Sequence, residues 1–600
     1  MKELKVLSKY IVKYKYHLLL GVVFVFLSNY FRILQPQVIR EALDFVVKEV
    51  KIFNAASEGA AKETILKDIS HSILMFGLNV LGLALLMGFF MYFMRQTIIV
   101  MSRLIEYDMR KELFVHYQNL SLAFYKRNNT GDLMSRITED VSRVRMAIGP
   151  AILYGINLVS MFSLAIYSMV QVSPKLTLYS LFPLPILSFI IYKVSHLINQ
   201  KSEVIQEQLA VLNSTAQETY SGIRVVKSFV QEASMLRLFS DQTEQFKSKN
   251  MDLVKIDAMF FPSMALLIGA STVVTVYVGG LMVIDGSISV GNIAEFVIYV
   301  NMLTWPVTAT GWIASLVQRA AASQKRLNEF MNERSEIQEE QNPHNAPIKG
   351  HIEFKDVSFT YAITGIQALK HVSFNIKQGQ KIAIVGRTGC GKSTIADLLV
   401  RMYDTTSGSI ELDGMDLTKW KLEAIRQGIA YVPQEVFLFS ETVANNIRFV
   451  SNSTDQEVMD MAAKVAVHED IMGLPEQYQT MVGERGVTLS GGQKQRISIA
   501  RALIKHPDIV VLDDCLSAVD AETEQKILGF LYDYLSSKTA IIITHRIFSL
   551  INFDQILVMD QGELVQIGTH DSLLKQEGLY QDMYNQQQLD KITDDQDENH

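Results

Sequence analysis

The chain has 600 residues, more than one ordinary soluble domain needs, so two or more structural units are expected. Hydrophobic residues make up 48% of it and charged residues 20%, with a mean hydropathy of +0.15, which favours a membrane protein. The net charge of −7 is small for this length and argues against a nucleic-acid partner. The only two cysteines, Cys390 and Cys515, exclude a disulfide framework.

The first half of the chain contains six apolar segments long enough to cross a hydrocarbon core of roughly 30 Å. They are residues 16–37, 71–94, 147–171, 174–195, 257–282 and 289–315. The basic segment 1–15 precedes the first of them without a small-residue cleavage site, so we interpret that apolar run as a retained span rather than a signal peptide. A six-span, lipid-embedded domain is therefore predicted over residues 16–333.

Basic residues predict the orientation of this domain in the cell membrane. Lys and Arg are abundant in the N-terminal segment and in the long stretches after the second and fourth spans, which places these regions and both termini in the cytoplasm. The two long stretches have helical apolar spacing, so we expect them to extend the spans below the membrane. Residues 334–350, with Pro343 and Pro347, form a predicted linker.

From residue 351 to 588 the pattern changes to short apolar strands that alternate with helices. The segments "IEFKDVSFTY", "KIAIVG", "IVVLDD", "AIIITH" and "QILVMD" predict an α/β domain with a largely parallel sheet. The acidic tail, residues 589–600, is predicted to be disordered. The expected fold class is thus an α-helical membrane domain fused to an α/β domain.

The segment "GRTGCGKST" matches a phosphate-binding P-loop in the right context, because it follows an apolar strand and opens a helix. Glycines there let backbone N–H groups converge on phosphate oxygens at the positive end of a helix. Lys392 is expected to reach the terminal phosphates and Ser393 to hold Mg²⁺. The predicted ATP-binding residues of this loop are Gly386, Arg387, Thr388, Gly389, Cys390, Gly391, Lys392, Ser393 and Thr394.

Two further strands end in residues suited to phosphate chemistry. The strand Ile509–Leu512 delivers Asp513 to its carboxyl end, where a carboxylate beside Ser393 would bind Mg²⁺ through water. His545 closes the strand "AIIIT" and is a candidate contact for the γ-phosphate.

The segment "LSGGQKQR", together with the P-loop, "LDD…SAVD" and "TH", resembles the ATP-binding cassette transporters over the whole second half. "YVPQ" looks like the family's Q-loop, which implies a magnesium and catalytic role for Gln434, and Tyr361 sits where an aromatic residue stacks on adenine. "FYKRNNTGDLMSRITEDV" and "SGIRVVKSF" resemble the cytoplasmic coupling regions of exporter subunits. The resemblance therefore implies a half-transporter of the multidrug and lipid exporter type, an ATP-hydrolysing translocase.

The resemblance also implies a dimer in which each ATP lies between one chain's P-loop and the other chain's signature motif. The residues implied to serve the partner's ATP are Ser490, Gly491, Gly492, Gln493 and Asp520. In this family a glutamate typically follows the magnesium aspartate, but this chain has Asp514. The shorter side chain draws the carboxylate back by roughly 1 Å, and such a displacement can cost about 10²-fold in rate.

Asp514 therefore predicts slow hydrolysis at this chain's own P-loop and, by resemblance to heterodimeric bacterial exporters, a non-identical partner with a competent site. A tolerated substitution with normal turnover is the alternative. Amphipathic drugs are the expected cargo. Lipid or peptide export by a homodimer, or an ATP-gated channel or sensor, are the alternatives.

Arg32 lies late in the first predicted span and Glu295 lies early in the sixth. Charged residues within spans are candidates for function. We expect Glu295 to face the translocation cavity and either to pair with Arg32 or to meet cationic substrates. The alternative is that both snorkel to the interface or fix helix packing.

Overall fold

The computed structural model describes residues 3–55, 60–483, 489–545 and 553–597, and these divide into two compact units. The first unit comprises Met1–Gln118 and Thr130–Glu333, and the second comprises Asn119–Asn129 and Arg334–His600. The short segment 119–129 thus belongs with the second unit although it lies within the first in sequence. The helical and α/β architectures confirm the predicted fold class.

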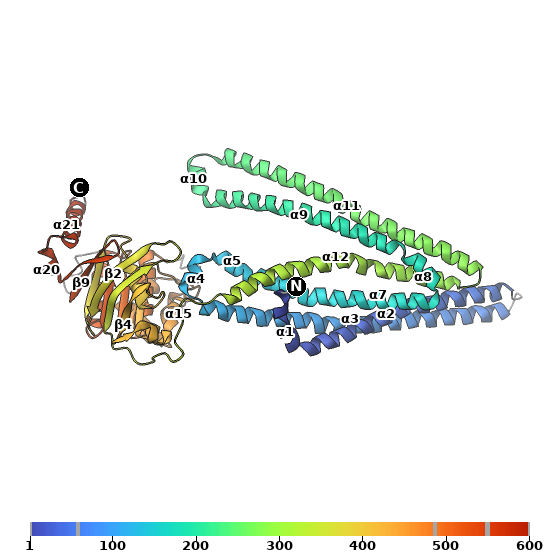
Figure 1. Ribbon diagram of the computed structural model, residues 1–600, viewed down its shortest axis with the longest axis horizontal. Coiled ribbons are helices and arrows are strands. Elements are labelled where there is room, and N and C mark those ends of the chain that lie inside the picture. The colour runs from blue at the N-terminus through green and yellow to red at the C-terminus, as the bar shows by residue number, and fades with distance from the viewer. Residues whose placement is uncertain (1–2, 56–59, 484–488, 546–552, 598–600) are drawn as a thin grey trace. The chain divides into compact units, whose positions relative to one another are not determined.

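The first unit is entirely helical (Figure 1). Its elements are η1 (Glu3–Leu7), α1 (Ser8–Lys13), α2 (Lys15–Ala55), α3 (Ala60–Asn119), α5 (Thr130–Ser135), η2 (Arg136–Asp140), α6 (Val141–Met146), η3 (Ala147–Ala151), α7 (Ile152–Val172), α8 (Pro174–Leu181), α9 (Pro183–Ser221), α10 (Ile223–Ser228), α11 (Glu232–Ile284) and α12 (Val290–Asn332). The pair α9 and α11 packs side by side along its length (Figure 1).

Several of these helices are far longer than a membrane is thick. At 1.5 Å per residue, the 41 residues of α2 extend about 60 Å, twice the hydrocarbon core. Four segments of the described chain are long and apolar enough to cross a membrane: Lys15–Ala55, Lys62–Asn119, Thr130–Val172 and Glu232–Ile284. The predicted spans 16–37, 71–94, 147–171 and 257–282 fall within them, while 174–195 and 289–315 fall on α8 with α9 and on α12.

The outer surface of α3 carries an exposed apolar stripe. Leu74, Leu78, Leu81, Leu85 and Phe89 recur at intervals of three and four residues, so they share one helix face, and each is at least half exposed. Such a face is stable against lipid rather than water.

The second unit combines two sheets with short helices. The antiparallel sheet has the order β2-β1-β4-β5, and the larger sheet has the order β10-β9-β3-β8-β7-β6, parallel except for β10. The strands are β1 (Ile352–Thr360), β2 (Gln367–Ile376), β3 (Lys381–Gly386), β4 (Ser407–Leu412), β5 (Met415–Asp416), β6 (Ile429–Val432), β7 (Ile509–Asp513), β8 (Thr539–Ile543), β9 (Gln555–Asp560) and β10 (Glu563–Gly568).

The helical elements of this unit are α4 (Leu122–Arg127), α13 (Lys392–Leu399), η4 (Leu417–Lys419), α14 (Leu422–Gly428), α15 (Val443–Ile447), η5 (Arg448–Val450), α16 (Asp455–Lys464), α17 (His468–Met472), η6 (Gln477–Gln479), α18 (Gly491–Leu503), α19 (Ala521–Tyr534), α20 (His570–Leu574) and α21 (Leu579–Asp597). Every residue of β7 is buried, as expected for the centre of a parallel sheet. Because β3, β8 and β7 are neighbours, their carboxyl ends meet at one edge.

The structure adds detail at both ends of this unit. In the described residues α21 runs past residue 589 as far as Asp597, and its first turn contains the fully buried Tyr580. The predicted linker 334–350 has little regular structure, but Ile337 and Ile348 are buried against the second unit, so it is packed rather than free.

Candidate functional site

The P-loop curls between β3 and α13 as the sequence predicts. Gly391 has a φ of +100°, and a Cβ there would lie 2.3 Å from the carbonyl oxygen of Ala368, so only glycine fits. The buried Lys392 donates through Nζ to the carbonyl oxygens of Gly386 and Arg387, at 2.9 Å each. Its ammonium group is therefore held inside the loop, where phosphate oxygens would replace the carbonyls as partners.

The remaining loop residues divide between surface and core. Arg387, Thr388 and Gly389 are exposed, whereas Cys390 and Thr394 are buried. Burial raises the pKa of the Cys390 thiol, so this cysteine is a packed neutral group rather than a reactive thiolate.

Asp513 lies at the end of β7 beside the P-loop. Its carboxylate is buried and accepts a hydrogen bond from the Ser393 hydroxyl. Burial raises the pKa of Asp513, and the neighbouring charge of Asp514 raises it further, while the bond from Ser393 lowers it. Mg²⁺ prefers oxygen ligands, and the Asp513 carboxylate and the Ser393 hydroxyl place such oxygens side by side. These two residues therefore fit that ion.

Asp514 follows directly, in a left-handed backbone conformation with φ of +44°. Its N–H donates to the carbonyl of Ile543 at 2.9 Å, and its carbonyl accepts from the Ser517 hydroxyl at 3.0 Å. The amide of Gln434, in the loop after β6, approaches its carboxylate at 3.5 Å. The structure thus brings together two predicted site residues that are far apart in sequence.

His545 lies in the same group, after the end of β8. It is half-buried, and burial with the nearby Lys392 lowers its pKa, while Asp514 and Asp513 oppose that shift. The imidazole is therefore neutral at pH 7, so one ring nitrogen can donate a hydrogen bond and the other can accept one.

Tyr361 contacts the first turn of the helix that follows the P-loop, α13. Its hydroxyl lies 3.1 Å from that of Thr394, and its ring contacts the edges of Phe359 and Tyr403. These rings line a cavity of about 600 Å³, which leaves room for a planar base beside Tyr361.

The signature motif caps a helix. The Ser490 side chain accepts from the N–H of Gln493, while the Gln493 side chain accepts from the N–H of Ser490, a capping box that starts α18. Gly492 has no space for a side chain, because a Cβ would lie 2.8 Å from the carbonyl oxygen of Ala518. Ser490 and Gly491 are exposed, so the helix start is open to another molecule.

Gln495, which no sequence motif singles out, joins this helix to the turn after β7. The Gln495 amide donates to the Ser517 hydroxyl at 3.2 Å and accepts from the Ala518 N–H at 3.0 Å. Asp520, at the end of that turn, is exposed and caps α19 by accepting from the Thr523 N–H at 2.9 Å.

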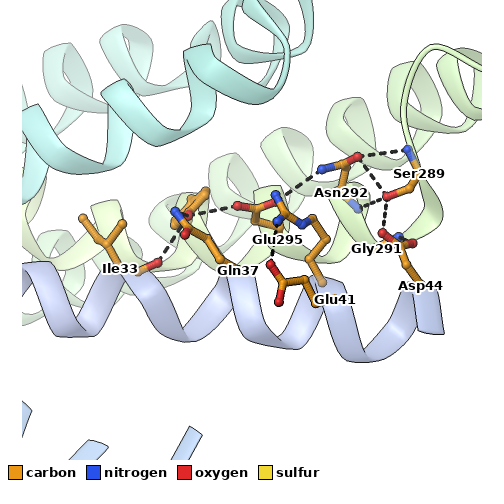
Figure 2. Close-up of polar contacts among 10 residues, drawn as sticks. Ile33, Gln37, Glu41, Asp44, Ser289, Gly291, Asn292 and Glu295 are labelled. Atoms are coloured by element: carbon orange, nitrogen blue, oxygen red, sulfur yellow. Dashed lines mark hydrogen bonds and ion pairs between the residues drawn. The ribbon is translucent and has the colours of Figure 1, made fainter. Parts of the chain in front are cut away.

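The predicted pairing of Glu295 with Arg32 is wrong. Glu295 in α12 is fully buried and pairs with Arg40, whose Nη1 lies 3.3 Å from Oε2 (Figure 2). The α2 helix continues to Ala55, so its contact face runs through Ile33, Gln37 and Arg40 at intervals of four and three residues. Arg32 is one residue away from that face, rotated by about 100°, and its side chain is exposed.

Other residues complete the polar contact between α2 and α12 (Figure 2). The Tyr299 hydroxyl lies 3.0 Å from Glu295 Oε1, and the Asn292 amide donates to Oε2 at 3.3 Å. Asp44 accepts from the Ser289 hydroxyl at 2.6 Å and from the Gly291 N–H at 2.8 Å. Extending the helical periodicity beyond residue 37 would have found these partners.

Comparison with known proteins agrees with this fold. The ABC transporter transmembrane region matches residues 18–307, and the ABC transporter domain matches residues 369–517. The chain has the fold of a solved bacterial Atm1-family ABC exporter with ATP bound, with a TM-score of 0.75 and 23% identity over 97% of this chain and 99% of that one. The protein is thus an ABC half-transporter, a multi-pass membrane protein with an ATPase domain.

Among named relatives, it is 38% identical to the multidrug resistance-like ATP-binding protein MdlA of Escherichia coli over 88% of this chain and 90% of that protein. It is also 38% identical to the probable multidrug resistance ABC transporter ATP-binding/permease protein YheI of Bacillus subtilis, over 83% and 86% of the two chains. The chain belongs to this family of ATP-driven exporter subunits, which work as dimers.

Proposed function

We propose that this chain is one subunit of a heterodimeric exporter of amphipathic drugs, in which its own ATP site turns over slowly. The single observation that carries the proposal is Asp514, a short carboxylate at the position of the catalytic base. Its carboxylate is only at the limit of hydrogen-bond distance from Gln434, at 3.5 Å. The names of MdlA, a multidrug resistance-like protein, and YheI, a probable multidrug resistance transporter, support drugs as the cargo.

The residues of this chain divide their work between two sites. Lys392 and the P-loop N–H groups would hold the phosphates of its own ATP, Tyr361 would stack on the base, and Asp513, Ser393 and Gln434 would hold Mg²⁺. The ion would neutralise charge on the phosphates and orient them. His545 contacts the γ-phosphate, and Asp514 orients the attacking water poorly, because its carboxylate is drawn back.

The signature motif serves the other site. The open start of α18 presents the Ser490 hydroxyl and glycine N–H groups at the positive end of a 13-residue helix, which suits contact with phosphate. Gln493 in the first turn of α18 and Asp520 at the start of α19 are the further residues expected to serve that site. The partner's P-loop, carrying a glutamate after its magnesium aspartate, would supply the competent ATP site.

The proposed orientation follows from the distribution of basic residues. Both termini and the ATPase domain lie in the cytoplasm. ATP binding closes the two ATPase domains and turns the membrane domains outward, and hydrolysis at the competent site resets them.

The decisive experiment compares hydrolysis by three purified preparations in lipid: this chain alone, the co-purified pair with the half-transporter encoded beside it, and the pair with the partner's catalytic glutamate replaced by glutamine. We expect fast turnover only in the intact pair and slow turnover by this chain alone. Strong turnover by the chain alone, abolished by Asp514→Asn, would instead establish a homodimer with a competent aspartate.

A further inference from the structure

The carboxylate of Glu295 is fully buried between α2 and α12, yet it has only one cationic neighbour in the described structure, Arg40. A buried carboxylate in a membrane domain is costly unless it is paired, and such residues mark functional sites by default. The identity and strength of its partner therefore decide what Glu295 does.

Arg40 is divided between two carboxylates (Figure 2). Its Nη1 lies 3.3 Å from buried Glu295, and its Nη2 lies 3.2 Å from Glu41, which is 57% exposed. Strong arginine–carboxylate pairs are bidentate, with both contacts at about 2.7–2.9 Å. Arg40 makes one long contact to each carboxylate. It is therefore held loosely by Glu295 and already contacts a second carboxylate, that of Glu41.

The surroundings of Glu295 suit an organic cation. Phe296 and Tyr299, which follow Glu295 in α12, belong to a hydrophobic cluster that also contains buried Met161 and Met169. Aromatic faces attract cations, and flexible methionines adapt to ligands of different shape. Glu295 thus lies next to a cluster of aromatic and methionine side chains, and such side chains can pack against the apolar body of a cationic compound.

We propose that Glu295 binds the charged group of cationic substrates. Arg40 pairs with Glu295 when no substrate is bound, and the substrate displaces Arg40 onto Glu41. This inference deepens the proposed drug-export function and rests on it. Exchange keeps the charges balanced, because the incoming cation replaces the guanidinium at Glu295 while Glu41 retains it. The contact between α2 and α12 must open for this exchange. It contains the polar residues Gln37 and Asn292, whose hydration offsets part of the free-energy cost of opening.

The test measures equilibrium binding of two probes of similar shape, cationic tetraphenylphosphonium and uncharged triphenylphosphine oxide, to the full-length chain in lipid nanodiscs. We expect Glu295→Gln to weaken tetraphenylphosphonium binding by about tenfold, or about 1.4 kcal/mol, and to change binding of the neutral probe by less than about twofold. Arg40→Gln should tighten tetraphenylphosphonium binding several-fold, because it removes the competing cation.

Glu41→Gln is the matched control on the exposed side. It removes the alternative partner of Arg40, so it should weaken tetraphenylphosphonium binding by about two- to threefold. A role in helix packing alone predicts no tightening in Arg40→Gln and equal changes for both probes, and either result overturns the proposal. Should Glu295→Gln fail to fold, the opposite signs expected for Arg40→Gln and Glu41→Gln still decide.

Binding is measured without ATP, so this outcome is independent of transport. ATP-driven uptake of the neutral probe into inverted vesicles tests the export function separately. Loss of the predicted binding pattern with intact neutral uptake would refute the cation site alone, whereas absent uptake of both probes would refute drug export.

Discussion

The side-chain amide of Gln434 lies 3.5 Å from the carboxylate of Asp514, although 80 residues separate them in the chain. The loop after β6 and the loop after β7 meet there because these strands are neighbours in a parallel sheet. The distance is the upper limit for a hydrogen bond, so the two side chains approach without forming a tight contact. The glutamate that the family resemblance predicts at position 514 would be one methylene longer.

Restoring that methylene should restore hydrolysis. We expect Asp514→Glu to raise ATP turnover by this chain about 10- to 100-fold, because it returns the carboxylate by roughly 1 Å toward the water. Steady-state ATPase rates of the purified chain in lipid measure the effect. Asp514→Asn is the control that removes the charge, and a rate for Asp514→Glu no higher than for Asp514→Asn would contradict a positional cause.

The P-loop should not tolerate a methyl group at Gly391. In Gly391→Ala the Cβ would lie 2.3 Å from the Ala368 carbonyl, and φ of +100° is unfavourable for alanine. We expect ATP affinity to fall at least about tenfold, measured with a fluorescent nucleotide. The control is Gly529→Ala in α19, where no atom lies within 4 Å of the added methyl and helix propensity favours alanine by about 1 kcal/mol. Equal losses in both variants would refute the steric argument.

Ser490 should act beyond capping its helix. Ser490→Ala and Thr454→Ala each remove a capping box, from α18 and α16 respectively, and should each cost about 1 kcal/mol of stability. Only Ser490→Ala should lower turnover of the co-purified dimer, by about tenfold or more, since Ser490 faces the partner's nucleotide in the proposed assembly. ATPase rates paired with thermal midpoints make the comparison, and parallel behaviour of the two variants would limit Ser490 to a structural role.

Asp397 in α13 should destabilise the ATPase unit at neutral pH. Burial raises its pKa to about 6 from the ordinary 3.8, while the Tyr431 hydroxyl, 3.2 Å away, partly opposes this. Because the folded state binds the proton more tightly, the cost is absent below about pH 4, grows as pH rises, and is complete above pH 6.

Asp397→Asn should therefore raise stability by about 2–3 kcal/mol at pH 7.5 and by less at pH 5. Asparagine keeps an oxygen that can accept from Tyr431, so that contact remains. Thermal midpoints of the full-length chain at the two pH values measure the difference. A stabilisation of the same size at both would show that ionisation of Asp397 is not its cause.

Much of the site follows from local sequence. The P-loop and the strand that ends at Asp513 are formed by residues close in the chain, and each lies where its spacing predicts. The pair Arg40 and Glu295 was missed, because the apolar pattern that defines a span ends near residue 37 while the helix continues to Ala55. Gln495 was missed because its contacts depend on how α18 packs against the turn after β7.

By itself the sequence determined the class of protein, its nucleotide chemistry and the short carboxylate at Asp514, because these depend on residue identity and local spacing. Tertiary structure alone decided which distant groups meet: Gln434 with Asp514, and Arg40 rather than Arg32 with Glu295. The physical reason is geometric. One residue along a helix turns a side chain by about 100°, so the partner of a buried charge is set by the packing of two helices and not by their composition.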